Sequence, residues 1–220
     1  FQEKQEGVSC NVFFKKDSEG NILNPLNSVV LPRTLKTIET SAFENNNIAS
    51  INIPNSVTDI GERAFWNNSI TSVYLPDSVT NLYEYAFASN PSTEFTFSKN
   101  MTTMAEGTIY LTSLTSLTVP SHIKTIGSAN TASTLQTLII EEGVEEIGDY
   151  AFGFNFNLNK LRLPSTLKHL GTAPFAGGNV TDGPDYIYQR NPDGTENTAV
   201  LNSYVGVNKS ITLPSQIKEI

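Results

Sequence analysis

Apolar and polar residues alternate in short segments that recur along the chain with a period of 22 residues. Each segment has two apolar residues separated by one other residue, and a slot that is proline in most copies follows directly. Alternation with a period of two is typical of a strand with one buried face. We therefore predict about seven or eight short strands, one per copy, each ending at or before the apolar residue that precedes the slot. Those residues are Leu31, Ile53, Leu75, Phe97, Val119, Ile140, Leu163 and Leu213.

The slot divides the chain into eight copies. Ser98 and Glu141 hold it in two copies and proline holds it in the others, where the missing N–H ends the strand. Further apolar residues follow three and six positions after the slot, and an Ala-Phe pair closes four copies. The pairs are Ala42-Phe43, Ala64-Phe65, Ala86-Phe87 and Ala151-Phe152.

A unit of 22 residues is too short to bury these apolar residues alone, so the copies must stack on one another. The Ala-Phe corner is bulkier than the strand corner, which should make the stack curve. The pattern therefore predicts a right-handed repeat solenoid of about eight copies, with a parallel β-sheet on its concave face.

The segment Ile51–Phe65 reads Ile-Asn-Ile-Pro-Asn-Ser-Val-Thr-Asp-Ile-Gly-Glu-Arg-Ala-Phe and resembles the unit of the BspA-like leucine-rich repeats. The resemblance covers about residues 26–179 and resumes near residue 210, with departures at Ser98 and Thr131. It implies a secreted or cell-surface protein, usually bacterial, and an association with adhesion to host proteins and cells.

Two segments lie outside the regular repeat. We expect residues 1–25 to cap the open end of the stack, and residues 26–220 to form the solenoid. An insertion at about residues 177–209 has two β-type segments around Asn191-Pro192-Asp193-Gly194, which predicts a hairpin. The last repeat is incomplete at Ile220, so we expect further chain after it.

Composition narrows the range of functions. The formal net charge of −8 repels phosphate backbones and argues against nucleic-acid binding. Cys10 is the single cysteine and there are two histidines, so neither a disulfide within the chain nor a zinc site is expected. No apolar run approaches the length of a membrane helix, which predicts no membrane insertion. We expect no cofactor and no metal.

Catalytic residues are not expected either. Catalysis by a nucleophile or by paired carboxylates needs groups that converge within hydrogen-bond reach. Glu94 is the only acid among the outward positions of the predicted sheet, and His122 and His169 belong to copies that are not adjacent. The acidic run from Glu141 to Asp149 is interpreted as a solvated face.

The outward positions of the concave sheet are rich in Ser and Thr. These residues either pair across copies and stabilise the sheet or form a ligand surface. Tyr, Arg and Trp are enriched at interface hot spots, and the tyrosines of the insertion either contact a partner or pack the hairpin onto the stack. The candidate partner-binding residues are Asn52, Tyr74, Thr96, Thr118, Arg162, Tyr186, Tyr188 and Trp66, the last expected to point outward after an Ala-Phe pair.

The sequence favours a non-enzymatic interaction module of a secreted or cell-surface protein, which binds a host or matrix protein through its concave face. One alternative is a solenoid that binds or processes carbohydrate, such as a parallel β-helix. The Ala-Phe corner and the single acid on the sheet face argue against a carbohydrate-processing enzyme. Another alternative is a passive spacer that displays a different domain.

Overall fold

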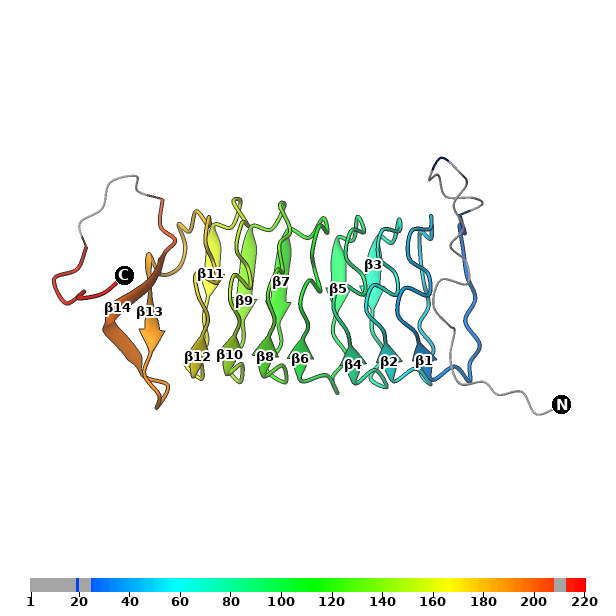
Figure 1. Ribbon diagram of the computed structural model, residues 1–220, viewed down its shortest axis with the longest axis horizontal. Helices are drawn as coiled ribbons and strands as arrows, with labels where there is room; N and C mark the ends of the chain where they lie inside the picture. The colour runs from blue at the N-terminus through cyan, green and yellow to red at the C-terminus, as the bar shows by residue number, and fades with distance from the viewer. Residues whose placement is uncertain (1–18, 20–24, 208–212) are drawn as a thin grey trace. The chain divides into compact units, whose positions relative to one another are not determined.

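The computed structural model describes residue 19, residues 25–207 and residues 213–220. The chain divides into two compact units, Phe1–Leu114 and Thr115–Ile220. Both are parallel-strand β-solenoid, about six turns in all, and their described residues contain no helix (Figure 1). The predicted solenoid fold is confirmed. The capping segment predicted for residues 1–25, Cys10 included, lies almost entirely outside the described residues.

The longer strands run just ahead of the proline slot and form what we call the strand face. In the first unit β3 (Ser72–Tyr74) pairs in parallel with β5 (Glu94–Thr96). In the second unit β9 (Thr137–Ile140) lies between β7 (Ser116–Val119) and β11 (Lys160–Arg162), again in parallel (Figure 1). All five strands end at or before the apolar residue predicted for their copy.

The strands predicted for the first two copies are absent. Among the described residues, no backbone hydrogen bond joins Leu31 or Ile53, or the residue before each, to another copy, so the ladder that defines a strand is missing. The strand expected to end at Leu213 falls on residues 208–212, outside the described part of the chain. The predicted number of strands on this face is therefore wrong, because the described residues contain five.

A second series of strands, two residues each, was not expected from the hydrophobic pattern. Within each unit these strands pair in parallel with their neighbours, in the order β1-β2-β4 in the first and β8-β10-β12 in the second. The second residue of each is the apolar residue six positions after the slot, and it is buried as predicted. The series is β1 (Thr37–Ile38), β2 (Asp59–Ile60), β4 (Asn81–Leu82), β6 (Thr103–Met104), β8 (Thr125–Ile126), β10 (Glu146–Ile147) and β12 (His169–Leu170).

Backbone hydrogen bonds also join the copies at the Ala-Phe corner. The N–H groups of Ser41 and Phe43 donate to the carbonyls of Glu62 and Ala64 in the next copy, both at 2.8 Å. The next N–H in this row, that of Asn45, likewise donates to the next copy. All three donors point the same way because Ser41 and Asn45 adopt left-handed φ of 55° and 57° on either side of Phe43.

The left-handed residues recur nine and thirteen positions after the slot, and we call these positions the corner positions. Several of their N–H groups donate to a carbonyl of the next copy, as when Tyr150 donates to Thr172 and Phe154 to Ala176. The corner positions with positive φ are Ser41, Asn45, Arg63, Asn67, Tyr85, Ser89, Gly107, Leu111, Ala129, Tyr150, Phe154, Ala173 and Gly177.

The phenylalanines of the Ala-Phe pairs stack on one another inside each unit. The ring of Phe65 lies 5.2 Å from that of Phe43 and 5.0 Å from that of Phe87, with nearly parallel planes. In the second unit Phe152 stacks on Phe175 at 5.9 Å. Each of these rings is fully buried, so the Ala-Phe corner forms an aromatic core along the stack.

A buried asparagine follows three residues after the phenylalanine, and the sequence analysis overlooked it. The side-chain amide of Asn68 donates to the carbonyl of Phe43 in the preceding copy at 2.8 Å and to that of Phe65 in its own copy at 3.2 Å. Its oxygen accepts from the N–H of Ile48 at 3.1 Å. Asn90 and Asn155 repeat this arrangement, and Asn46 makes the equivalent bonds to Leu26 and Phe43. The asparagines therefore satisfy backbone groups that the core leaves without water.

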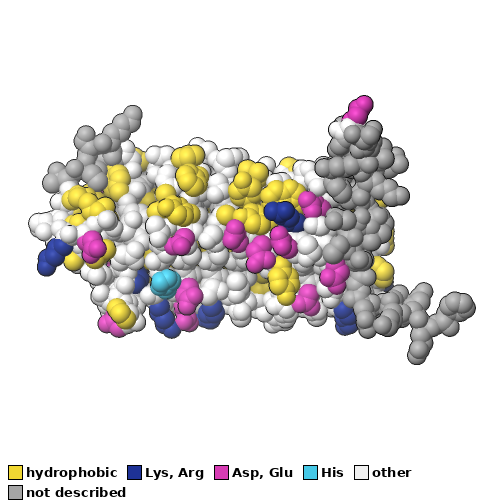
Figure 2. Space-filling model, viewed as in Figure 1, with side chains coloured by type: hydrophobic (Ala, Val, Ile, Leu, Met, Phe, Trp, Pro, Cys, Tyr) yellow, Lys and Arg dark blue, Asp and Glu magenta, His cyan; other side chains and the backbone are white. Residues whose placement is uncertain are grey.

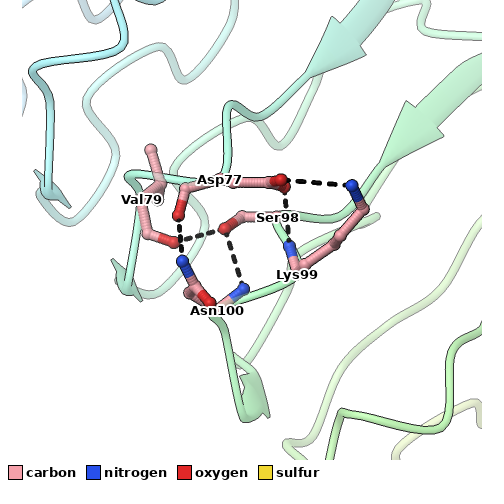
Figure 3. Close-up of polar contacts among 5 residues, drawn as sticks. All are labelled: Asp77, Val79, Ser98, Lys99 and Asn100. Atoms are coloured by element: carbon pink, nitrogen blue, oxygen red, sulfur yellow. Dashed lines mark hydrogen bonds and ion pairs between the residues drawn. The ribbon is translucent and has the colours of Figure 1, made fainter.

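Ser98 shows how a copy without the slot proline is held. Its hydroxyl donates to the carbonyl of Val79 at 2.6 Å, inside the core. Next to it, Asn100 donates to the carbonyl of Asp77 at 2.6 Å, and Lys99 pairs with the Asp77 carboxylate at 3.2 Å. Figure 3 shows these side chains turned toward one another across the two copies. Polar contacts thus replace the rigid proline at this position.

The insertion forms the predicted hairpin. β13 (Tyr186–Arg190) pairs antiparallel with β14 (Glu196–Tyr204). In the turn, Asn191 donates its N–H to the carbonyl of Thr195 at 2.8 Å, and the Asp193 carboxylate accepts from the Thr195 N–H at 2.9 Å. Gly194 has a φ of 87°, the conformation that a glycine adopts without strain.

Replacement of the buried ring tests the aromatic core. Phe65→Ala is expected to lower the free energy of unfolding by about 3 to 5 kcal/mol, because it removes a ring packed on both faces and leaves a cavity. Trp66→Ala should lower it far less, since Trp66 is only half-buried. Chemical denaturation of both variants gives the comparison. Equal losses would show that the inward and outward positions of this corner are reversed.

Candidate functional site

The strand face carries five of the residues that the sequence proposes as contacts. Asn52, Tyr74 and Thr96 are exposed in the first unit, and Thr118 and Arg162 are exposed in the second. No two of the five belong to the same copy. Tyr74 lies directly beside Thr96 in the parallel register of the first unit, and Thr118 and Arg162 lie on either side of Ile139 in the second.

Tyr74 is held by an acid of the next copy. Its phenolic hydroxyl donates a hydrogen bond to the carboxylate of Glu94, although the Tyr74 side chain is 57% exposed. This hydrogen bond is the main reason why the pKa of Tyr74 is raised. The polar end of Tyr74 is therefore engaged within the chain, and its ring remains open to solvent.

Arg162 is likewise engaged. Its guanidinium lies 2.5 Å from the carboxylate of Asp182, and Lys160 lies 3.7 Å from the same group. The hydrogen bond from Arg162 holds the pKa of Asp182 below its usual range. One acid thus faces both cations that the sequence places on this part of the strand face.

Tyr186 and Tyr188 lie on β13 and are half-buried. The ring of Tyr186 packs against that of Tyr204 on β14, with 5.4 Å between centroids. Tyr188 pairs with Leu201 across the hairpin. Both of these contacts lie within the hairpin and do not pack it onto the stack, so the roles predicted for the two tyrosines stay predictions.

Trp66 belongs to a cluster of aromatic rings in the first unit. Its ring lies 5.5 Å from that of Tyr85 and 6.1 Å from that of Tyr110, and the two tyrosines are 5.7 Å apart. The Arg63 guanidinium sits 5.1 Å above the Trp66 ring. Trp66 and both tyrosines are half-buried, so part of each ring faces solvent.

Acidic side chains border this cluster. The hydroxyl of Tyr85 donates to the Glu106 carboxylate at 2.6 Å. Burial, followed by this hydrogen bond, raises the pKa of Tyr85 to about 12. Glu62 lies 3.7 Å from Arg63, and Glu84 is the equivalent acid of the copy in between. We call the three rings, Arg63 and the three glutamates the acidic aromatic patch.

A second aromatic group, the exposed aromatic patch, lies in the second unit. Tyr150, Phe154 and Phe156 are 47%, 55% and 58% exposed. The rings of Tyr150 and Phe154 stack at 6.5 Å, and those of Phe154 and Phe156 meet at 6.2 Å. Figure 2 shows hydrophobic side chains gathered in patches on the surface of the molecule. Contiguous apolar surface of this kind is uncommon unless it serves an interaction.

Hydrophobic periodicity did not reveal Tyr85, Tyr150 and Phe154, because their columns are not apolar in most copies. Tyr85, Leu111, Tyr150 and Phe154 all occupy corner positions, where a left-handed φ disfavours bulky side chains. The same columns hold the small or turn-forming residues Ser41, Asn45, Asn67, Ser89, Gly107 and Gly177 in other copies. A bulky residue in a column that otherwise favours Ser, Asn or Gly is the signal that could have revealed them.

Acids of the run from Glu141 to Asp149 form hydrogen bonds and an ion pair with the neighbouring copy. The Glu142 carboxylate accepts from the N–H groups of Ser165 and Thr166 at 2.9 Å and 3.2 Å, and these bonds lower the pKa of Glu142. Glu145 pairs with Lys168 at 2.6 Å, which lowers the pKa of Glu145. The run is solvated, and it also stabilises the stack.

In the described part of the chain, no three His, Cys, Asp or Glu side chains gather so that they could hold a metal ion. His122 is half-buried and His169 is exposed on β12, in different copies. Within the same residues there is no helix of the length and hydropathy needed to cross a bilayer.

The repeats match a known family. The family described as "BspA type Leucine rich repeat region (6 copies)" matches residues 22–130 and 129–182, which is more than half of the chain. A search of curated proteins found no match.

Solved structures give weaker likenesses. The pneumococcal vaccine antigen PcpA is 19% identical, with 81% of this chain and 63% of that chain covered and a TM-score of 0.45. A leucine-rich repeat protein of Eubacterium ventriosum is 15% identical, with 72% of each chain covered and a TM-score of 0.34. One from Bacteroides ovatus is 14% identical, with 67% of this chain and 75% of that chain covered and a TM-score of 0.30. The present chain thus spans less than two thirds of the PcpA chain.

The raised pKa of Tyr85 predicts a dependence of stability on pH. Because the folded pKa is about 12 and the ordinary value is 10.0, the contribution of the protonated phenol is complete below pH 10 and is lost as the pH rises toward 12. The difference in tyrosinate absorbance between the native protein and Tyr85→Phe should therefore have its midpoint near pH 12. A midpoint near pH 10 would contradict both the burial of the Tyr85 phenol and its hydrogen bond to Glu106.

Proposed function

Because this chain belongs to the BspA-type leucine-rich repeat family, we propose that it is a non-enzymatic interaction module of a secreted or cell-surface protein that binds a host or matrix protein. A repeat scaffold offers an extended surface on which side chains recur at a fixed spacing. A protein partner of large contact area suits such a surface better than a small substrate does, because a small substrate needs an enclosed site.

The observation that carries this proposal is the exposed aromatic patch of Tyr150, Phe154 and Phe156. Each ring leaves about half of its surface in water. Aromatic residues that a partner can desolvate supply most of the binding energy at protein interfaces. Nothing in the described chain covers the rings, so their apolar surface is available to a partner.

The patch is held rigidly. Tyr150 donates its N–H to Thr172 at 2.9 Å and Phe154 donates to Ala176 at 2.6 Å, so the backbone under both rings is fixed to the next copy. Phe156 packs over Gly177, where an added Cβ would lie 2.8 Å from the ring. A surface that is ordered before binding loses little conformational entropy when the partner arrives.

The strand face stays a second candidate surface for the same function. Its proposed contacts are Asn52, Tyr74, Thr96, Thr118 and Arg162, all exposed. Because acids of the chain already engage the polar groups of Tyr74 and Arg162, a partner would have to compete for them. We therefore place the principal contact on the exposed aromatic patch.

Binding measurements with matched variants test the proposal. The purified chain is applied to a panel of immobilised extracellular-matrix proteins and glycans, and the affinity is measured by biolayer interferometry. The triple variant Tyr150→Ser, Phe154→Ser, Phe156→Ser should bind at least about tenfold more weakly, since each ring is a candidate hot spot. Serine is suitable because it already occupies corner positions at Ser41 and Ser89.

Tyr83→Ser is the matched control, because Tyr83 is a tyrosine in the first unit that is also 47% exposed. This control should bind as the native chain does. Loss of binding in Tyr74→Ala or Arg162→Ala with full binding in the triple variant would move the contact to the strand face. Binding to glycans alone would support the carbohydrate-binding alternative, and no binding at all would support the passive spacer.

A further inference from the structure

The glutamates of the acidic aromatic patch form a column of like charges. Glu62, Glu84 and Glu106 each lie eight residues after the slot of their copy, and all three are exposed. These residues lie outside the strands, and at the roughly 4.8 Å spacing of stacked copies like charges repel one another. The repulsion within this column lowers the stability of the folded chain locally.

Some acids of the chain are neutralised by a base from a neighbouring copy. Asp77 pairs with Lys99 and Glu145 pairs with Lys168. By contrast, Glu84 and Glu106 have no cation within ion-pair distance among the described residues, and Glu62 has only Arg63 at 3.7 Å. The column therefore keeps a net negative charge beside the aromatic rings.

The rings can hold a cation. The guanidinium of Arg63 already lies over the face of Trp66, and both groups remain partly open to solvent. A cation over the face of an aromatic ring is attracted by the negative charge of the π-system. Tyr85 and Tyr110 lie beside Trp66 and have no such cation of their own among the described residues.

The ring faces and the carboxylates therefore favour the same ligand group, a guanidinium. Guanidinium stacks on aromatic rings and also bonds to carboxylates with two parallel hydrogen bonds, which an ammonium group does not do. We propose that the acidic aromatic patch binds an arginine-containing basic segment of a partner protein, with guanidinium groups between the rings of Tyr85 and Tyr110 and the carboxylates of Glu84 and Glu106. Arg63 occupies part of this surface and competes with the incoming cation.

This site lies in the first unit and shares no residue with the exposed aromatic patch of the second unit. Either surface can therefore fail its test while the other stands.

Trp66 provides a direct readout. It is the only tryptophan in the sequence, so its fluorescence reports this patch alone. The whole chain is titrated with a synthetic peptide of alternating glycine and arginine, and separately with the same peptide carrying glutamine or lysine for arginine. The arginine peptide should give a saturable fluorescence change that weakens as salt is added. The glutamine peptide should give none, and the lysine peptide should bind more weakly.

Charge variants show whether the patch itself is responsible. Glu84→Gln and Glu106→Gln should each weaken the arginine peptide by about two- to fivefold, as expected for one exposed ion pair. Glu146→Gln removes the same charge from the second unit and should have no effect. Arg63→Gln should tighten binding about two- to fivefold in isothermal titration, because it removes the competing cation.

Four results would overturn the proposal. The first is equal binding of the glutamine peptide, and the second is equal binding of the lysine peptide, which would remove the preference for arginine. The third is an equal loss in Glu146→Gln, which would show that only net charge matters. The fourth is weaker binding in Arg63→Gln, which would show that Arg63 helps the ligand to bind.

Discussion

Asn68 lies buried between two copies, and its side-chain amide holds backbone groups of both. A copy of 22 residues has no core of its own, so its buried N–H and C=O groups must find partners in the next copy. The asparagines and the backbone bonds of the corner supply these partners. These hydrogen bonds fix how each copy aligns with the next, and in that alignment Phe43, Phe65 and Phe87 stack face to face. The spacing of the whole repeat depends on this polar ladder inside an apolar corner.

The same ladder creates the surfaces for which we propose functions. Its backbone hydrogen bonds accompany a left-handed residue on each side of the buried phenylalanine. These corner positions hold Ser, Asn or Gly in several copies. Tyr85, Leu111, Tyr150 and Phe154 are bulky residues in that strained conformation, although all four keep contact with solvent. Leu111, Tyr150 and Phe154 strain the backbone and still leave 53%, 47% and 55% of their surface exposed, which stability explains poorly. Display to a partner explains it better.

The sequence predicted the repeat, the buried columns and the Ala-Phe corner because each is a property of periodicity. It missed β1 and its equivalents because two residues are too short for any alternation. It predicted strands before Leu31 and Ile53, where the structure has none. Apolar spacing indicates which face is buried, but it does not indicate whether the backbone is hydrogen-bonded to a neighbouring copy. Trp66 was expected to point outward, and it is half-buried beside Tyr85 and Tyr110. Tyr85 beside it was missed because its corner position follows from backbone φ, which hydrophobicity does not encode.

The central claim is that the bulky residues at corner positions are displayed and do not hold the fold together. The most direct test is the free energy of unfolding of Phe154→Asn, measured by denaturant titration against the native chain. Asparagine adopts the left-handed conformation readily, so relief of strain should offset the lost ring contacts. The account predicts a stability within about 1 kcal/mol of the native value, or above it. A loss of about 3 kcal/mol or more, typical of removing a buried aromatic ring, would contradict it.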